Sequence, residues 1–314
     1  MSRGSSRRAF LRSSAALFAG LALPRFRLRR SDGPLPFSIS LAEWSFHRAL
    51  MSGRMANLDF PQRARELGFR GIEYVNVFFG DHVKDLGYLG ELRRRCDHAG
   101  VRSLLIMCDG LGALGDPDPA ARRRAVAAHR PWLEAAAFLG CHSIRVNARS
   151  SGSWDEQRDR AAEGLHALAL LADPLALDVL VENHGGLSSN GRWLAETLAA
   201  ADHPRVGALP DFGNFRVGPE EEYDRYRGVA ELMPFARAVS AKSYDFDAEG
   251  WETTLDYPRL LGIVLDAGYR GWIGVEYEGA RLSEEDGIRA TKTLLERVGR
   301  AWAADHPSED RRGR

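Results

Sequence analysis

The sequence is poor in cysteine and has no excess of charge of either sign. Its three cysteines, Cys96, Cys108 and Cys141, are an odd number without the spacing of a metal site, which disfavours a disulfide framework. We expect them to be small buried apolar side chains, with Cys141 immediately before a strand. Lysine plus arginine and aspartate plus glutamate number 43 each, so no net field favours binding to nucleic acid or to an anionic membrane surface.

The sequence also lacks two phosphate-binding signatures. No Gly-x-Gly-x-x-Gly follows the first expected strand, and no Gly-x-x-x-x-Gly-Lys occurs in the chain. Dinucleotide-binding and P-loop functions are therefore disfavoured. What the chain does have is length and apolar content, because 314 residues, 44% of them hydrophobic, suit one large α/β barrel or two small domains.

The amino terminus departs from this even composition. Residues 6–12 read Ser-Arg-Arg-Ala-Phe-Leu-Arg and precede a short apolar segment, residues 13–23, with small residues where a peptidase would cut. The pattern resembles a twin-arginine export signal, and the alternative is a basic disordered tail with a chance apolar patch. The segment is too short for a permanent membrane span. The resemblance implies the twin-arginine machinery as a partner, export of a folded protein, and a periplasmic or extracellular location.

The rest of the chain alternates strands with helices. After the signal (1–30) and a linker (31–36), one domain is expected over 37–302, followed by a polar, disordered tail (303–314). Strands are expected at residues 37–41, 71–77, 101–107, 142–147, 177–182, 206–211, 236–244 and 272–277. Helical segments are expected at residues 60–67, 89–98, 121–139, 155–171, 191–201, 223–232, 257–267 and 284–302. This alternation predicts a single (β/α)8 TIM barrel rather than an open doubly wound sheet.

The fifth expected strand ends in the most informative stretch. Residues 179–186 read Val-Leu-Val-Glu-Asn-His-Gly-Gly, an apolar run that stops abruptly at polar groups. Such a run is typical of a strand that is buried on both faces of a parallel sheet. The two glycines allow a sharp turn, so we expect Glu182 and His184 at the carboxyl end of the strand, where α/β proteins keep their sites.

Neighbouring strands bring matching groups to the same edge. Asp211, Lys242 and Glu276 end the sixth, seventh and eighth expected strands, so a barrel places them with Glu182 around one mouth. Three carboxylates in one cavity raise one another's pKa unless a cation lies among them, and a divalent ion is the economical solution. Oxygen-rich ligands favour Mn²⁺ or Mg²⁺, with Co²⁺ or Zn²⁺ as alternatives. The competing interpretation pairs each acid with an arginine near a loop.

At this point the residues resemble a known group. Glu-Asn-His-Gly after the fifth strand, Asp-x-Gly-Asn after the sixth and a glutamate in the eighth are similar to the xylose-isomerase-like barrel superfamily, over residues 37–302. That superfamily holds sugar isomerases and epimerases, inosose dehydratases and class-II apurinic endonucleases. The resemblance implies that Glu182, Asp211 and Glu276 are metal ligands, and that Glu182 and Glu276 also move the proton, as in ketose epimerases.

Two positions depart from the superfamily pattern. Ser240 stands where a histidine ligand is usual, and Asn214 stands where a histidine often follows the aspartate. His184, Asn214 or water would then complete the coordination, and His184 is either a ligand or a hydrogen-bonding loop residue. Lys242 is interpreted as a catalytic residue that stabilises an enolate oxygen or acts as a base.

The expected substrate is a small carbohydrate. Its candidate contacts are Glu43, Trp44, His47, Asn214 and Tyr244. The expected chemistry is metal-assisted proton abstraction next to a sugar carbonyl through an enediolate, which gives isomerisation or epimerisation. Loss of a β-substituent would instead make the protein a sugar or 3-keto-glycoside lyase or dehydratase. A non-catalytic sugar-binding protein is the alternative of another class, and the neutral charge and export signal disfavour a DNA-repair nuclease.

Overall fold

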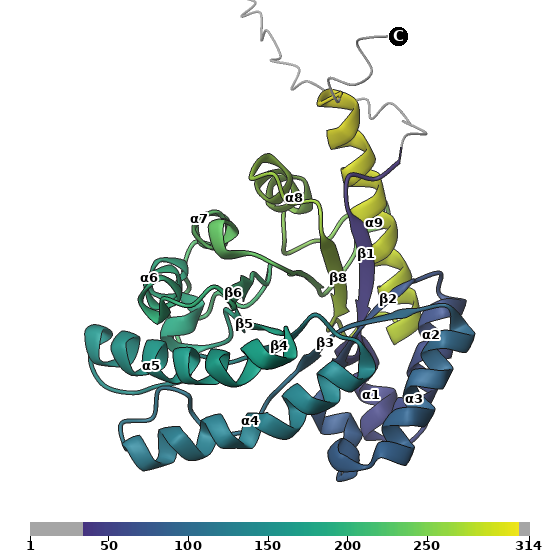
Figure 1. Ribbon diagram of the computed structural model, residues 1–314. Helices are drawn as coiled ribbons and strands as arrows, with labels where there is room; N and C mark the ends of the chain where they lie inside the picture. The colour runs from purple at the N-terminus through teal and green to yellow at the C-terminus, as the bar shows by residue number, and fades with distance from the viewer. Residues whose placement is uncertain (1–33, 308–314) are drawn as a thin grey trace, which may run out of the picture.

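Eight parallel strands form the centre of the computed structural model, which describes residues 34–307 (Figure 1). The strands are β1 (Ser38–Ala42), β2 (Gly71–Val75), β3 (Arg102–Met107), β4 (Ser143–Val146), β5 (Asp178–Glu182), β6 (Val206–Leu209), β7 (Val239–Ser243) and β8 (Trp272–Tyr277). Each lies beside its neighbours in the chain, in the order β6-β5-β4-β3-β2-β1-β8-β7. This arrangement confirms the predicted (β/α)8 barrel.

A short seam between β6 and β7 closes the barrel. Isolated backbone bridges span it, one of them between Asp211 and Ser240. The amide of Phe212 donates to the carbonyl of Ser240 over 3.1 Å. Pro210 has no N–H to add to this ladder, so the regular pairing of β6 stops at Leu209. The seam therefore brings Asp211 against β7.

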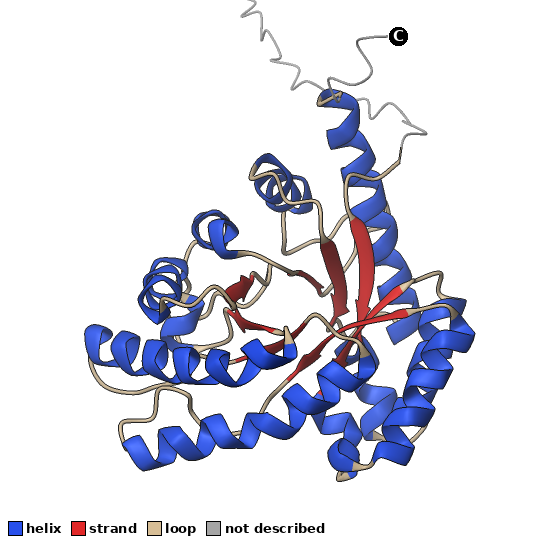
Figure 2. Cartoon of the chain, viewed as in Figure 1, coloured by secondary structure: helices blue, strands red, loops and turns tan. Residues whose placement is uncertain are grey.

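Helices cover the outside of the strands throughout the described chain (Figure 2). They are α1 (His47–Met51), α2 (Phe60–Glu66), α3 (Leu86–Ala99), α4 (Pro119–Leu139), α5 (Trp154–Ala172), α6 (Gly191–Ala201), α7 (Arg225–Leu232), α8 (Tyr257–Asp266) and α9 (Glu284–Asp305). Their ends follow local chemistry. The Asp118 carboxylate caps the first amides of α4, and Gly140 ends that helix with a φ of +79°.

The boundaries differ from the sequence-based expectation where side chains or proline intervene. β2 was expected to run to residue 77, but it ends at Val75 because Asn76 turns inward. The Asn76 side chain accepts from the amide of Asp109 over 3.0 Å and donates to its carbonyl over 2.8 Å. β7 starts at residue 239 rather than 236, since the 3-10 turn Met233–Phe235 contains a proline and delays it.

The predictions for the two chain ends and for the cysteines have different outcomes. The predicted signal (1–30) and residues 308–314 of the predicted tail lie outside the described residues, and α9 continues past residue 302 to Asp305. The three cysteines are free and buried, as predicted, and Cys141 lies just before β4. In the part of the chain that the structure describes, no helix combines the length and apolarity needed to cross a membrane.

Candidate active site

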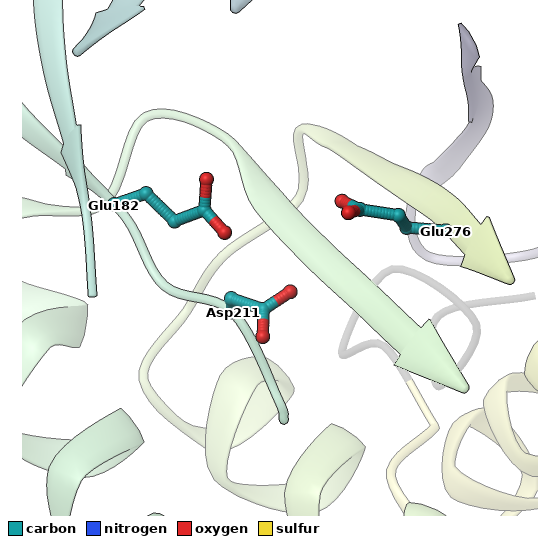
Figure 3. A group of neighbouring side chains, drawn as sticks. All are labelled: Glu182, Asp211 and Glu276. Carbon is teal, nitrogen blue, oxygen red and sulfur yellow. The ribbon is translucent and has the colours of Figure 1, made fainter. Parts of the chain in front are cut away.

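Three carboxylates converge at the carboxyl end of the barrel (Figure 3). Glu182 ends β5, Asp211 follows β6 by two residues, and Glu276 lies near the end of β8. One oxygen from each side chain lies within 4.8 Å of the other two, and the residues are 1%, 0% and 4% exposed. The structure therefore brings together the carboxylates that the strand ends predicted.

Glu182 is held from two sides. Its Oε1 accepts a hydrogen bond from Asn214 Nδ2 over 2.8 Å. Its Oε2 lies 2.7 Å from Arg145 Nε, an ion pair in which the N–H does not point at the oxygen. Arg145 also donates to Asp109 over 2.7 Å, so this buried guanidinium is shared between two acids. Glu182 is thus fixed without having all of its acceptor capacity filled.

Asp211 is positioned by its own turn. Its Oδ1 accepts from the amides of Gly213 and Asn214, both over 2.8 Å. Its Oδ2 is buried and accepts no hydrogen bond from residues 34–307. The Asn183 side chain accepts from the Asp211 amide over 2.7 Å and donates to the Asp211 carbonyl over 3.0 Å. This pair of bonds ties the end of β5 to the end of β6 and fixes the spacing of Glu182 and Asp211.

Glu276 faces β7. Ser240 Oγ donates to its Oε2 over 3.0 Å, and Lys242 Nζ lies 3.2 Å from its Oε1. Lys242 is only 2% exposed and also lies 3.2 Å from Glu278 and 4.0 Å from Asp211. The residue that replaces the usual histidine, Ser240, therefore binds a carboxylate, and the ammonium of Lys242 lies among the acids.

The pKa values of the three carboxyl groups shift in different directions. Burial raises the pKa of Glu182 to about 7 against the opposing charge of Arg145, and burial raises the pKa of Asp211 to about 7 against Lys242. Burial would raise the pKa of Glu276 as well, but Lys242 and Arg145 outweigh it and lower that pKa. Glu276 is consequently the carboxylate that stays ionised most readily.

This group fits a divalent cation. Glu182 Oε2 and Asp211 Oδ2 are buried acceptors without a hydrogen bond among the described residues, and hard oxygen donors of this kind suit Mg²⁺ or Mn²⁺. The two positive charges of Arg145 and Lys242 balance only two of the three carboxylates when all three are ionised. The acids therefore have protein cations as partners, as the interpretation without a metal requires. Two of their oxygens also accept no hydrogen bond from the described residues, which leaves donors for the divalent ion of the other interpretation.

His184 lies at the rim of this group rather than inside it. The turn that follows it needs positive φ at Gly185 (+79°) and Gly186 (+60°), as the sequence predicts. The three oxygens that lie within 4.8 Å of one another do not include a His184 nitrogen. Loss of hydration and the charges of Arg145 and Lys242 lower the pKa of His184, so its imidazole is neutral at neutral pH. Its role as a ligand stays a prediction.

A cavity of about 350 Å³ opens beside this group, and of the three carboxylates only Glu276 is among its lining residues. Its polar wall consists of Asp109, Arg145, His184, Glu276 and Glu278, and its apolar wall includes Trp44. Cavities of this size, with apolar walls and a few polar groups, hold small molecules. The Trp44 ring stacks on His47, with ring centroids 5.1 Å apart, and on Phe78, with centroids 5.9 Å apart, so its orientation in the cavity wall is fixed.

The other predicted substrate contacts fall in different places. Glu43 is completely buried, where it accepts from Asn57 over 2.7 Å and from the Val75 amide over 3.0 Å, and it does not line the cavity. Burial raises its pKa to about 8 against these two bonds. His47 is bonded to the Trp44 carbonyl and likewise lies outside the cavity lining.

Asn214 and Tyr244 are also absent from the lining of this cavity. Asn214 joins Glu182 to Lys242, whose Nζ donates to its Oδ1 over 3.3 Å. Tyr244 lines a second cavity, with Asn214 and His184. Gly213 leaves the room for this arrangement, because a Cβ there would lie 2.6 Å from the Tyr244 hydroxyl and 2.9 Å from Lys242 Cδ.

Sequence reasoning missed four charged residues of the site: Arg145, Asp109, Glu278 and Glu73. Arg145 had a signal, because it interrupts a strand that is otherwise buried on every side and so must have charged partners. Asp109 lies two residues after β3 and Glu278 follows β8 directly, so both obey the same strand-end rule as Glu182. Glu73 lies inside the barrel on β2, where Ser40 donates to it over 2.5 Å.

The sequence of this chain matches a known protein family. The family described as xylose isomerase-like TIM barrel matches residues 61–298. This chain belongs to the xylose isomerase-like TIM barrel family. It shares its fold with the apo form of 3-keto-D-glucoside 4-epimerase from E. coli (TM-score 0.63, 16% identity, 84% of this chain and 99% of that one). A xylose isomerase-like TIM barrel protein from Mycobacterium smegmatis in complex with magnesium is comparably similar (TM-score 0.64, 17% identity, 84% and 97%).

One curated protein shows local sequence similarity to this xylose isomerase-like barrel. The C-glycoside deglycosidase alpha subunit of Arthrobacter globiformis is 39% identical over 79 residues. The matched segment is 24% of this chain and 20% of that protein, so the chain matches only about a fifth of its curated relative.

Proposed function

We propose that this family member is a divalent-metal-dependent enzyme that moves a proton next to a carbonyl group of a carbohydrate, giving isomerisation or epimerisation. The observation that carries the proposal is the buried group of Glu182, Asp211 and Glu276 beside a cavity that Glu276 lines. Within residues 34–307, Glu182 Oε2 and Asp211 Oδ2 accept no hydrogen bond. A structure that shares the fold is named as a 3-keto-D-glucoside 4-epimerase, which supports a sugar substrate. A magnesium complex on the same fold supports Mg²⁺, or the chemically similar Mn²⁺, as the metal.

The two glutamates have complementary roles. Lys242 keeps Glu276 ionised, so Glu276 is suited to accept the proton from the carbon next to the carbonyl. In the metal-free protein, burial raises the pKa of Glu182 to about 7, so of the two glutamates it is the one that more readily holds a proton, which suits it to return one to the substrate. When bound, a divalent ion would polarise the carbonyl oxygen as a Lewis acid.

Lys242 is the third member of the proposed machinery. Its ammonium is buried among Asp211, Glu276 and Glu278, so it stays charged, and the acids hold its pKa well above the ordinary value despite the cost of burial. A fixed positive charge in this position stabilises negative charge that develops on a substrate oxygen. Asn214 orients both Lys242 and Glu182 and acts as a positioning residue.

The second candidate function is elimination from the same enolate. The local relative is named as a subunit of a C-glycoside deglycosidase, which favours a substrate that carries a leaving group next to the abstracted proton. The same glutamate removes the proton, and a group on the neighbouring carbon departs instead of a proton returning. The products distinguish the two functions, because only elimination releases a second molecule.

The metal requirement is tested by the metal content of protein purified without chelator. We expect about one equivalent of Mg²⁺ or Mn²⁺ per chain, and its loss in Asp211→Asn, which removes a ligand oxygen. Asp97→Asn is the control, because Asp97 is exposed on α3, away from the site. A metal-free protein that takes up no divalent ion and still binds sugar would instead indicate a non-catalytic sugar-binding protein.

We also propose that residues 1–30 direct export through the twin-arginine machinery, on the strength of Arg7 and Arg8 before an apolar segment. Replacing both arginines with lysine should leave a full-length precursor in the cytoplasm, whereas Arg12→Lys should not. Cell fractionation measures the outcome. Equal export of the double variant would contradict the assignment.

A further inference from the structure

A second cavity lies next to the one that Glu276 lines. It measures about 570 Å³, and its walls come from the turns that follow β5, β6 and β7. His184 lines both cavities, so the two hollows meet at this residue. The proton transfer proposed above takes place on the Glu276 side, and none of its steps uses the second cavity.

Among the described residues, one positive charge of the second cavity has no protein partner. Two arginines line it, Arg216 and Arg225, together with one acid, Glu222. Arg225 is paired with Glu222. Within residues 34–307, the guanidinium of Arg216 makes neither a hydrogen bond nor an ion pair with the protein. The first cavity has the opposite balance, with Asp109, Glu276 and Glu278 set against Arg145 alone.

Arg216 is carried by a firmly held loop. The amide of Tyr223 donates to the carbonyl of Phe215 over 2.8 Å, and the amide of Val217 donates to Glu221 over 2.9 Å, so the loop is a short hairpin. Phe215 is fully buried and packs so closely on α7 that a Cβ on Gly228 would lie 2.2 Å from its ring. This anchoring fixes the backbone of Arg216 beside the cavity.

Tyr244 supplies a flat surface in the second cavity. It lines the second cavity and is half-buried, next to Gly213 and close to Lys242. An aromatic face of this kind stacks on a sugar or aryl ring. The second cavity therefore offers a ring platform and an unpaired guanidinium, which binds carboxylates and other anionic oxygen groups in a planar, two-pronged geometry.

We propose that the two cavities form one cleft for a glycoside, with the reacting sugar ring on the carboxylate side and an anionic group of its other portion bound by Arg216. This inference rests on the proposed function for the identity of the first ring. It adds a specificity determinant, because a neutral or free sugar fills only half of the cleft. The natural substrate is then a conjugate that carries a carboxylate or a similar anion away from the reacting ring.

Two probes that differ only in charge test the proposal. 4-Carboxyphenyl β-D-glucopyranoside and its neutral 4-carbamoyl analogue are titrated calorimetrically into the full chain. We expect the charged probe to bind about tenfold more tightly, as one charge-assisted hydrogen-bonded pair provides. Arg216→Gln should abolish the difference without weakening the neutral probe, and Arg216→Glu should reverse it. Arg130→Gln, an exposed position on α4 outside both cavities, should keep it.

Three results would overturn the cleft: equal affinity for the two probes, a preference that survives Arg216→Gln, or no binding of the charged probe. The readout is binding, so it is separate from turnover. If the charged probe binds more tightly but the protein binds no metal and catalyses no proton exchange, the glycoside cleft is supported and the proposed enzymatic function is refuted. If the protein catalyses proton exchange in free sugars but binds both probes equally, the enzymatic function is supported and the cleft is refuted.

Discussion

Arg145 and Lys242 determine how much negative charge the three carboxylates retain. Arg145 lies 2.7 Å from Glu182, and Lys242 lies 3.2 Å from Glu276 and 4.0 Å from Asp211. A cation this close to the ligands competes with a divalent ion by simple Coulomb repulsion. The metal site of this chain is therefore expected to be weaker than an all-acid site of the same shape.

Lys242→Met tests that competition. The side chain keeps its volume and loses its charge, so Mn²⁺ should bind at least about tenfold more tightly, measured by calorimetry with chelator-treated protein. Lys84→Met, at an exposed residue before α3, should leave the affinity unchanged. Weaker binding in Lys242→Met would show that the ammonium supports the metal site instead of opposing it.

Glu276→Gln addresses the proton carrier. The amide keeps the shape and the contact with Ser240, but it cannot accept the proton, so kcat should fall by about 10²- to 10⁴-fold with the circular dichroism spectrum unchanged. Glu249→Gln, in an exposed turn, is the matched control. Full activity in the Glu276 variant would remove this residue from the mechanism.

At the residue scale, the sequence supports only part of the site. Glu182, Asp211 and Glu276 were predictable because each follows an apolar strand, and the carboxyl ends of parallel strands meet in one place. The pairing of Arg145 with Glu182 was not, because it depends on which face of β4 the arginine occupies and on the reach of its side chain. The burial of Glu43 was missed for a similar reason, since its partners lie later in the chain: Asn57 in a 3-10 turn and Val75 at the end of β2.

At the scale of elements, the turns after the strands create the site. The β6 turn holds Asp211 through two amides, and the β5 turn is tied to it through Asn183. Strands and helices were predictable from apolar runs and glycine ends, whereas the 3-10 turns after β2 and before β7 depend on Asn76 and on a proline in a short segment. Those turns decide which residues face the mouth.

Gly213→Ala tests the packing of the β6 turn against β7. A methyl group would meet the Tyr244 hydroxyl at 2.6 Å and Lys242 at 2.9 Å, so both side chains must move. We expect kcat/KM to fall by about ten- to a hundredfold, because small displacements of catalytic groups are costly.

The control for that variant is Gly262→Ala on α8, where a Cβ meets nothing within 4 Å. It should raise the free energy of unfolding by about 0.5 to 1 kcal/mol, since alanine favours a helix, and leave kinetics unchanged. Unaltered kinetics in Gly213→Ala would mean that Tyr244 and Lys242 need not hold their positions.

At the scale of the whole molecule, buried acids make stability depend on pH. Burial raises the pKa of Glu43 to about 8 and the pKa values of Glu73, Glu182 and Asp211 to about 7, all from ordinary values near 4. The folded state therefore keeps protons that the unfolded state has lost. Stability falls wherever the folded state holds more protons, so the metal-free protein should become less stable between pH 6.5 and pH 8.

Chemical unfolding with and without chelator measures this effect. The urea midpoint should fall between pH 6.5 and pH 8 in chelator, and Mn²⁺ should raise the midpoint more at pH 8, because it binds the deprotonated carboxylates. A midpoint that is flat or that rises with pH in chelator would contradict the burial of protonated acids.

The central claim is that the three carboxylates and a divalent ion move a proton next to a sugar carbonyl. Its most direct test is solvent deuterium exchange into free sugars and 3-keto-glycosides, followed by NMR. The account predicts incorporation at the carbon next to the carbonyl, with or without net conversion, and its loss on chelation and in Glu276→Gln. Exchange that persists in chelator, or no exchange by the metal-loaded protein into any of these substrates, would contradict it.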